Sequence, residues 1–282
     1  AMNSATASFL TQHIGFGNWV GSNSSACSTG TEALALAYQH IQDGRADVML
    51  AGSCETDGPI IWSVFDSLRA LQRSYNDTPE QASRPLSATA RGFVPGAGAG
   101  ALVLEDYQHA MERGAEIYAE IVGASVNSGG QRQGGSKTRP NQMSIIRCIR
   151  DTLDQAEVRP GQIDLVSGHL TATMADPIEV ASWAQALELS KEEFPLINSV
   201  KSMIGHCIGA AGAIESVASV LQMKNGYVHP SINSEDLHPK VLEHLKEGKV
   251  PQAFLERDLE YVVKANFGFG DVNACVLFKS FN

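Results

Sequence analysis

Two segments far apart in this chain follow the same plan, and this repeat constrains the fold more than any other feature. Residues 23–44, NSSACSTGTEALALAYQHIQDG, and residues 201–226, KSMIGHCIGAAGAIESVASVLQMKNG, each run from a turn of small and polar residues into an alanine-rich helix. Both helices are followed by glycine, a common residue at helix ends. The repeat indicates a duplicated α/β unit, which we divide into halves 1–118 and 119–282.

The rest of the sequence alternates strands with helices. Short apolar runs bounded by glycine or charge are typical of buried strands, and they occur at 47–53, 100–106, 163–169 and 195–202. Helical spacing of apolar residues occurs at 60–71, 141–158, 175–187 and 209–226. Two further apolar segments surround a glycine turn at 261–281. This order predicts a layered α/β fold with mostly parallel strand pairing.

Composition excludes several classes of function. The net charge is −10 and no long basic run exists, which argues against a nucleic-acid or membrane-surface role. The five cysteines are odd in number and scattered without a CxxC pair, so they predict neither a disulfide framework nor a zinc site. No signal peptide or membrane-spanning stretch is visible. We therefore expect a soluble protein of the reducing cytoplasm.

Cys27 is a candidate nucleophile. It lies in SACSTG, between small residues that permit a sharp strand-to-helix turn. Backbone N–H groups at a helix N-terminus favour a thiolate and can lower a cysteine pKa from about 8.5 to between about 3.5 and 7.5. The alternative is a small buried cysteine with a packing role, and this stretch alone does not decide between them.

Two histidines favour the catalytic interpretation. His169 ends the strand at 163–169, and His206 lies in KSMIGHCIGAAG, just before a helix. A lone histidine in a turn is most often structural, but both follow predicted strands at the end where open α/β sheets bind ligands. One thiolate with two imidazoles suits carbon–carbon bond formation on thioesters, because the sulfur carries the acyl group and the imidazoles hydrogen-bond to a developing oxyanion.

The motifs taken together resemble one family. SACSTG, DVMLAGSCE, ASRPLSATARGFVPGAGAGALVLED, HLTAT, NSVKSMIGHCIGAAGAIE and NFGFGDVNA occur in order along the whole chain. The sequence resembles a β-ketoacyl-[acyl-carrier-protein] synthase of the elongating type, in the thiolase superfamily. The resemblance implies a duplicated, layered αβαβα fold. Family members have a much longer stretch before the nucleophile than the 26 residues here, so we expect the N-terminal half to be incomplete in this chain.

The resemblance also implies roles for individual residues. Cys27 accepts the acyl chain, and His169 and His206 bind the malonyl thioester carbonyl. Lys201 orders the site electrostatically, and Glu215 is its acidic partner. The remaining implied residues are Phe269, whose backbone N–H forms the oxyanion hole with that of Cys27, the substrate-binding or supporting residues Thr171, Thr173 and Phe267, and the carrier-protein docking residues Arg69 and Arg73. The two arginines are four apart and would share a helix face if the helix at 60–71 extended that far.

The implied reaction is a decarboxylative Claisen condensation. A Cys27-bound acyl chain condenses with malonyl-acyl-carrier protein, giving a β-ketoacyl chain two carbons longer in fatty acid or polyketide and pigment synthesis. No metal or organic cofactor is implied, because phosphopantetheine arrives on the acyl carrier protein. The resemblance further implies a homodimer or a heterodimer with a related subunit, through a short strand at 18–24.

Three alternatives are open at this stage. A non-catalytic partner subunit of the chain-length-factor kind shares the fold but generally lacks the nucleophile. A degradative thiolase uses a second catalytic cysteine, whereas Cys275 lies in the apolar ACVLF run and is predicted to be core. An initiating synthase pairs cysteine and histidine with asparagine instead of a second histidine. Cys54, Cys148 and Cys207 are expected to be packed and unreactive.

Several positions depart from the family pattern. Leu170 follows the first histidine where the family has glycine, Ala172 takes another small position, and the segment to Asp176 is one residue short. Asp271 replaces the second glycine of the closing turn, and Ala265 replaces a polar residue. Because leucine lacks the access of glycine to positive φ, we expect this loop to differ. The departures suggest a specialised branch with an intact Cys-His-His set.

Overall fold

The computed structural model describes residues 2, 4–130, 138 and 140–281. Its helices are α1 (Ala5–Ile14), α2 (Thr29–Gln42), α3 (Pro59–Ser67), α4 (Tyr107–Glu112), α5 (Gln142–Gln155), α6 (Asp176–Leu187), α7 (Lys201–Ile204), α8 (Ala211–Asn225) and α9 (Pro239–Leu242). Its strands are β1 (Val48–Glu55), β2 (Gly98–Glu105), β3 (Ala119–Ser128), β4 (Leu165–Ser167), β5 (Leu196–Asn198), β6 (Tyr227–Val228), β7 (Leu255–Glu256), β8 (Tyr261–Gly268) and β9 (Val272–Ser280).

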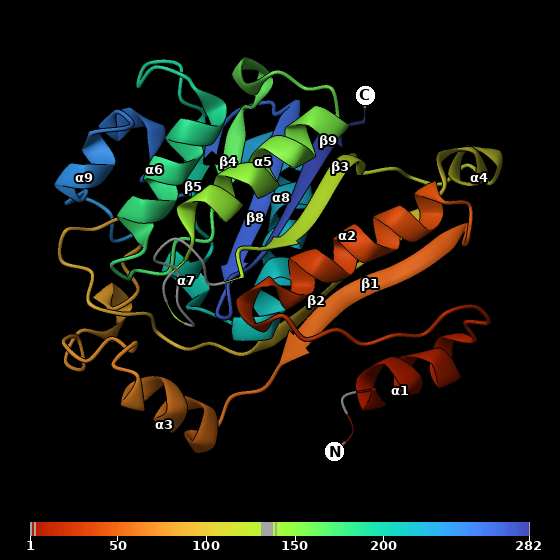
Figure 1. Cartoon of the computed structure of the whole chain (residues 1–282), viewed down its shortest axis with the longest axis horizontal. Coiled ribbons are helices and arrows are strands. Elements are labelled where there is room, and N and C mark those ends of the chain that lie inside the picture. The colour runs from red at the N-terminus through yellow and green to blue at the C-terminus, as the bar shows by residue number, and fades with distance from the viewer. Residues whose placement is uncertain (1, 3, 131–137, 139, 282) are drawn as a thin grey trace.

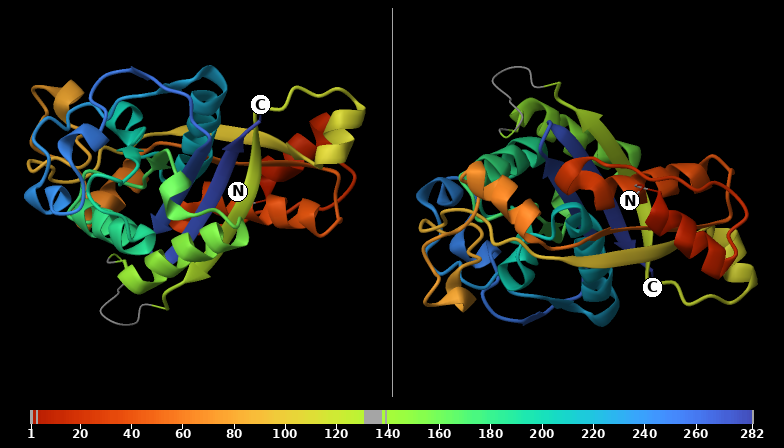
Figure 2. Two further views of the ribbon diagram at one scale, coloured as in Figure 1. Left: turned by 90° about the horizontal axis from the view of Figure 1, so that it is seen from above. Right: turned by 90° about the horizontal axis from the view of Figure 1, so that it is seen from below.

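The main elements form stacked layers of helix and sheet. Helices α5 and α6 cover one face of a five-stranded sheet, α2 and α8 cover its other face, and the β1–β2 pair lies beyond them (Figure 1). Helix α1, at the red end of the colour scale, lies outside these layers near β1, where Cys54 contacts Thr6 (Figure 2). Two clusters of buried apolar side chains fill the space on either side of the large sheet. The chain is therefore layered α/β, as the strand–helix alternation predicts.

The strand pairing differs from the sequence prediction. The large sheet has the order β3-β9-β8-β4-β5, and only β4 pairs in parallel, with β5 and with β8. The pairs β1–β2, β3–β9 and β8–β9 are antiparallel. The expectation of mostly parallel pairing is wrong because the glycine turn after β8 returns the chain directly as β9, and β3 then adds beside β9. The β8 and β9 strands are buried along most of their length, which explains their continuous apolar runs.

The repeated segments meet at the centre of the molecule. In both, a single 3-10 turn precedes the helix and contains a residue at positive φ, Ala26 at 50° and Ile208 at 45°. Helices α2 and α8 then cross in close contact. A Cβ added to Gly30 would lie 2.3 Å from the backbone nitrogen of Ala213, and one added to Gly212 would lie 2.5 Å from that of Thr31. Small residues thus bring the two turns, which carry the candidate catalytic residues, next to one another.

Two local predictions differ from the described structure. Residues 18–24 form no strand within this single chain, where no other described strand lies beside them, and Trp19 and Val20 are 50% and 43% exposed; the predicted interface strand, which would pair with a partner subunit, stays a prediction. The helix expected at 60–71 is too long: it ends at Ser67, and two residues later Arg69 takes a left-handed φ of 55°. None of the helices within the described residues is long and apolar enough to cross a membrane.

Candidate active site

The turn that carries Cys27 is fixed to the ends of β8 and β9. Cys27 lies in the 3-10 turn that leads directly into α2. The next residue, Ser28, donates its hydroxyl hydrogen bond to the carbonyl oxygens of Asn266 and Val272, at 3.0 and 2.8 Å. Gly268 permits this contact, because a Cβ there would lie 2.6 Å from the Ser25 carbonyl oxygen. The position of Cys27 therefore depends on the glycine turn at the other end of the chain.

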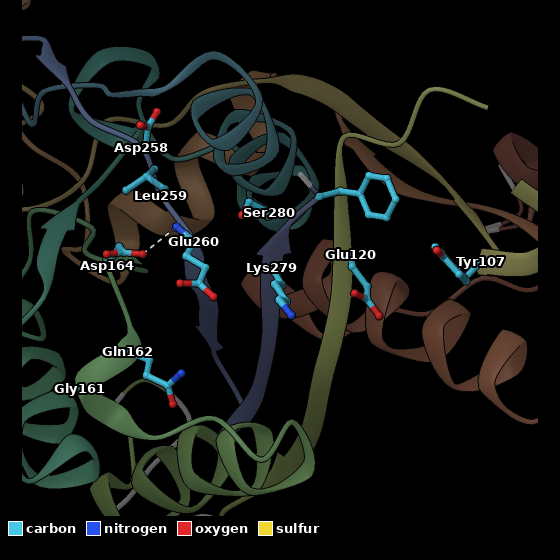
Figure 3. A pocket seen from close by; sticks show the side chains of 11 residues that line it. Tyr107, Glu120, Gly161, Gln162, Asp164, Asp258, Leu259, Glu260, Lys279 and Ser280 are labelled. Atoms are coloured by element: carbon cyan, nitrogen blue, oxygen red, sulfur yellow. Dashed lines mark hydrogen bonds between the residues drawn. The ribbon is translucent and has the colours of Figure 1, made fainter. Parts of the chain in front are cut away.

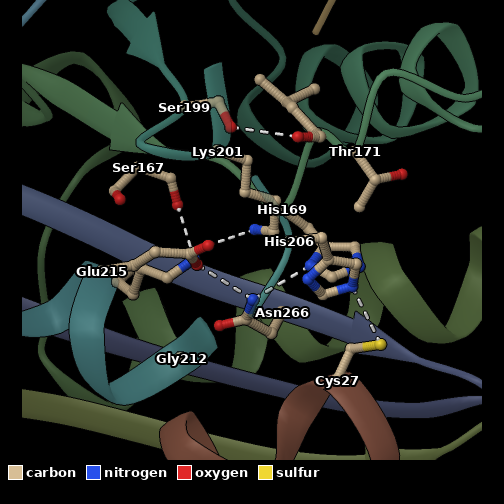
Figure 4. Close-up of polar contacts among 12 residues, drawn as sticks. Cys27, Ser167, His169, Thr171, Ser199, Lys201, His206, Gly212, Glu215 and Asn266 are labelled. Atoms are coloured by element: carbon tan, nitrogen blue, oxygen red, sulfur yellow. Dashed lines mark hydrogen bonds and ion pairs between the residues drawn. The ribbon is translucent and has the colours of Figure 1, made fainter. Parts of the chain in front are cut away.

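Both predicted histidines converge on Cys27 (Figure 4). The Nε2 atom of His206 lies 3.1 Å from Cys27 Sγ, and the ring of His169 packs edge-on against that of His206 at 5.3 Å between centroids. One ligand-type atom from each of the three residues lies within 4.8 Å of the others, and all three residues lie in the interior of the chain. The backbone N–H of His206 donates to the Val94 carbonyl at 2.7 Å, which anchors its loop.

Two buried carboxylates shape the loop that carries His169. Glu179 accepts the backbone N–H groups of His169 and Leu170 at 2.7 and 2.8 Å. Asp176 accepts those of Thr171 and Ala172 at 2.8 and 3.0 Å. Burial, together with the charge of Asp176, raises the pKa of Glu179 to about 7. Sequence reasoning missed both roles, although two acidic residues in the first turn of a helix directly after a candidate histidine were a visible signal.

The hydrogen bonds of Asn266 determine the tautomer of His169. Its amide nitrogen lies 3.1 Å from Glu215 Oε2 and 2.9 Å from His169 Nδ1. A carboxylate can only accept, so this end of Asn266 is the NH₂ group, and Nδ1 of His169 must accept as well. Its Nε2 then carries the proton. His169 therefore presents a hydrogen-bond donor, of the kind that stabilises negative charge on a substrate oxygen.

A buried charge network lies behind the histidines. Glu215 on α8 forms ion pairs with Lys201 and with Lys264 Nζ, the latter at 2.7 Å. All three side chains are at most 2% exposed. Burial alone would raise the pKa of Glu215, but the two ammonium groups hold it at about 2. The contact between Lys201 and Glu215 was expected. The participation of Lys264 was not predicted, although a charged residue inside the apolar run YVVKANF was a visible signal for it.

Burial and this charge network keep both imidazoles neutral. Burial is the main reason that the pKa of His206 falls to about 3. The charge of Lys201 lowers this pKa as well, and its effect is larger than the opposite effect of Glu215. Burial, Lys201 and Lys264 hold the pKa of His169 well below its usual range. Neutral imidazoles can accept a proton from a thiol or donate a hydrogen bond to a developing oxyanion. They cannot provide a permanent positive charge.

The predicted low pKa of Cys27 is wrong. Burial raises the pKa of its thiol to about 12, and the charge of Lys201 and the backbone N–H of Phe269 lower it only in part. The helix N-terminus does not compensate for complete removal from water. The resting residue is therefore a thiol, and His206 Nε2 is the base within reach of its proton. The N–H of Phe269 points at the sulfur, and that of Cys27 contributes a second, weaker interaction.

Comparison with known proteins agrees with this geometry. Residues 1–110 match the family described as beta-ketoacyl synthase, N-terminal domain, and residues 118–235 match beta-ketoacyl synthase, C-terminal domain. A ketosynthase structure, solved in a complex titled as a type II PKS acyl-carrier protein with its ketosynthase bound to the hexaketide, is 32% identical and superposes with a TM-score of 0.91, covering 99% of this chain and 67% of that one. This chain belongs to the β-ketoacyl synthase family.

Two further relatives of this β-ketoacyl synthase show the range of the family. The 3-oxoacyl-[acyl-carrier-protein] synthase 1 of Escherichia coli is 35% identical over 91% of this chain and 60% of its own length. The structure titled the ishigamide ketosynthase/chain length factor is 27% identical with a TM-score of 0.89, over 100% of this chain and 66% of that one. For eight similar curated relatives, the chain spans 52% to 65% of their length.

Three of the departures from the family pattern have structural explanations. Leu170 and Ala172 adopt positive φ values of 21° and 62° although neither is glycine, so the loop keeps a left-handed backbone that Glu179 and Asp176 hold. Asp271, at φ 67°, accepts the backbone N–H that precedes α5 at 3.2 Å. This contact links the glycine turn of the β-ketoacyl synthase to a neighbouring helix.

The supporting residues lie around the three central side chains. Thr171 and Thr173 hydrogen-bond to each other at 3.0 Å in the loop after His169. The ring of Phe267 is buried 6.2 Å from that of His169. Phe269, on the turn after β8, packs near Phe65 at 6.1 Å between centroids.

The docking arginines are arranged differently from the prediction. They do not share a helix face, because α3 ends before Arg69. Instead Arg69, Arg73 and Arg91 line one hollow of about 280 Å³. Arg73 also forms an exposed ion pair with Asp66 at 2.6 Å.

A larger hollow does not belong to this site. It measures about 840 Å³ and lies at the opposite end of β8 from Asn266, among several carboxylates (Figure 3). Cys275, Cys148 and Cys207 are buried, whereas Cys54 is exposed and the expectation that it is packed is wrong.

Proposed function

We propose that this β-ketoacyl synthase chain catalyses the decarboxylative Claisen condensation of a Cys27-bound acyl chain with malonyl-acyl-carrier protein. The convergence of one thiol and two neutral imidazoles beside a backbone N–H carries the proposal. In the first half-reaction, His206 Nε2 accepts the thiol proton and the sulfur attacks the acyl thioester. The departing carrier-protein sulfur takes a proton, and the acyl chain stays on Cys27.

The second half-reaction uses the histidines as donors. Loss of carbon dioxide from the malonyl group leaves its bonding electrons as an enolate, whose oxygen accepts hydrogen bonds from Nε2 of His169 and of His206. Among the described residues, no partner contacts Nδ1 of His206, so nothing holds its proton on one nitrogen. The enolate carbon attacks the Cys27 thioester, and the oxyanion forms at the N–H groups of Cys27 and Phe269. One such donor contributes roughly 3 to 4 kcal/mol. Collapse then releases the sulfur and the β-ketoacyl product.

We propose that the reaction uses no metal and no organic cofactor of its own. The thiol, the imidazoles and the backbone N–H groups supply a nucleophile, a base and oxyanion stabilisation, and decarboxylation supplies the carbanion. Cysteine and histidine are also zinc ligands, so the same three atoms would bind zinc at the cost of the nucleophile. All five cysteines are free thiols, which fits the cytoplasmic location that we propose.

We propose that the acyl carrier protein docks over the arginine hollow. Three arginines surround it, and carrier proteins are acidic. The hollow lies close to the reacting atoms, because Leu71 in its wall pairs with Phe93, whose ring contacts that of His206 at 5.1 Å. We also propose that the protein works as a dimer, with a copy of itself or with a related subunit, and that exposed Trp19 and Val20 belong to that interface.

A non-catalytic chain-length-factor-like subunit is the second candidate, because one structural relative includes a chain length factor. The intact set of Cys27, His169 and His206 favours the catalytic role. The test is peptide mass spectrometry after mixing the protein with acyl-carrier protein and then with malonyl-carrier protein, with C27A as the control. An acyl adduct on the Cys27 peptide that is discharged as a longer β-ketoacyl product supports condensation. Loading confined to a partner subunit supports the second candidate instead.

A further inference from the structure

Lys264 lies where a lysine is costly. It belongs to β8, a strand whose residues are all buried, and its side chain is 0% exposed. Burying an ammonium group is unfavourable unless it is paired and fully hydrogen-bonded. The neighbouring pair of Lys201 and Glu215 is already neutral without it. Lys264 is therefore not needed to balance the charge of Glu215, and another role must explain its position.

The contacts of Lys264 form a complete oxygen cage. Its Nζ lies 2.7 Å from Glu215 Oε2, 2.6 Å from the carbonyl oxygen of Ala265 and 3.2 Å from that of Ser167. An ammonium group has three hydrogen-bond donors, and all three have an acceptor here. One carboxylate and two carbonyl oxygens are also the ligands that hard cations use in proteins. The Lys264 side chain thus places a covalently attached cation among three oxygen atoms of the kind that bind free cations.

The cage is connected to His169 through a single chain of hydrogen bonds. Glu215 Oε2, which binds Lys264, also accepts from Asn266 Nδ2 at 3.1 Å. The same NH₂ group donates to His169 Nδ1 at 2.9 Å and thereby sets the tautomer that exposes a donor at Nε2. The pair of His206 and Cys27 lies outside this chain of hydrogen bonds, because no hydrogen bond joins it to Lys264 in the described structure.

We propose that Lys264 is a positioning residue for the condensation step: its ammonium group fills an oxygen cage formed by Glu215, Ala265 and Ser167, and so holds Asn266 and His169 in the donor arrangement. This inference rests on the proposed condensing function. It predicts that Lys264 affects the second half-reaction and does not affect acyl loading.

The test separates the two half-reactions in the variant K264M, with K279M on β9 as the control. Acyl transfer to Cys27 is followed by intact mass, and condensation by release of carbon dioxide from malonyl-carrier protein. We expect loading in K264M to equal that of the wild type and condensation to fall about 10- to 100-fold, the loss typical of a misplaced catalytic group. Unchanged condensation, or an equal fall in both half-reactions, overturns the proposal.

A second variant tests the cage itself. In K264A the oxygen ligands remain and the tethered cation is gone, so ammonium or potassium chloride should restore condensation. Tetramethylammonium chloride at equal ionic strength is the control, because that cation is too large to enter. Rescue by the small cations alone supports the cage, and failure of rescue in a folded variant overturns it. If K264A folds only in ammonium or potassium chloride, the melting temperature replaces condensation as the readout: a rise with these two salts and not with tetramethylammonium chloride supports the cage, and an equal rise with all three overturns it. A wild type that neither loads nor condenses overturns the proposed function instead.

Discussion

Replacing Glu215 by glutamine should destabilise the protein strongly, because it removes the carboxylate with which two buried lysines form ion pairs. Glu215 is 2% exposed, and Lys264 Nζ lies 2.7 Å from its Oε2. Two unit charges at that distance attract by about 6 kcal/mol at an effective dielectric constant of about 20. In E215Q this attraction is lost, and the ammonium groups of Lys201 and Lys264 stay buried and repel each other.

The net effect can be bounded. Desolvation offsets part of the attraction in the wild type, and removing one member of a buried pair typically costs about 3 to 5 kcal/mol. For a chain of this size each kcal/mol lowers the melting temperature by about 2 to 4 °C. We therefore expect E215Q to melt about 6 to 20 °C below the wild type. Glu112 on α4 is exposed, so E112Q is the matched control and should melt with the wild type.

The double variant E215Q/K264M decides whether charge is the cause. It leaves one unpaired buried cation in place of two, so it should be more stable than E215Q alone. The assay is thermal melting followed by circular dichroism. The pKa of Glu215 is about 2 in the folded state, so its contribution is fully present above its unfolded pKa of about 4.5 and is lost as the pH falls toward 2. The difference between E215Q and wild type should thus shrink as the pH falls from about 4.5 toward 2. A melting temperature of E215Q equal to that of the wild type, or a double variant less stable than E215Q, would refute the reasoning.

Three further predictions follow from the site. Burial raises the pKa of Cys27 to about 12, so its thiol stays protonated at pH 7 and iodoacetamide should alkylate exposed Cys54 first in peptide mass spectrometry; preferential labelling of Cys27 would show a thiolate instead. Zinc should inhibit acyl loading reversibly because Cys27, His169 and His206 can ligate it, and loading that is insensitive to zinc contradicts that ligand geometry. The folded-state pKa of His206 is about 3, so the unfolded state binds a proton that the folded state excludes, and stability should fall as the pH drops from about 6.5 to 3. The contribution of His206 to the free energy of unfolding should fall by about 1.4 kcal/mol for each pH unit of acidification. It is measured as the difference in unfolding free energy, from urea titrations, between wild type and H206Q; the same pH dependence in both proteins would contradict the low pKa.

The sequence alone determined the layered α/β class and the three side chains that we propose to be catalytic. Each depends on local information: apolar period for the strands and helices, and small residues around Cys27 for the turn. The repeat of residues 23–44 in 201–226 was also visible, because matching turn and helix patterns survive in sequence. His169 and His206 were found since each follows a predicted strand.

Only the tertiary structure decided the electrostatics and the strand directions. The pKa of Cys27 depends on how completely the folded chain excludes water, and a helix-start pattern contains no information on that. Lys264 and Glu215 are 49 residues apart in sequence and become partners because β8 and α8 pack together. In the same way, the antiparallel return of β9 depends on a turn that the strand–helix alternation does not reveal. Local patterns specify which elements form, whereas long-range packing specifies the dielectric environment and the neighbours of every buried charge.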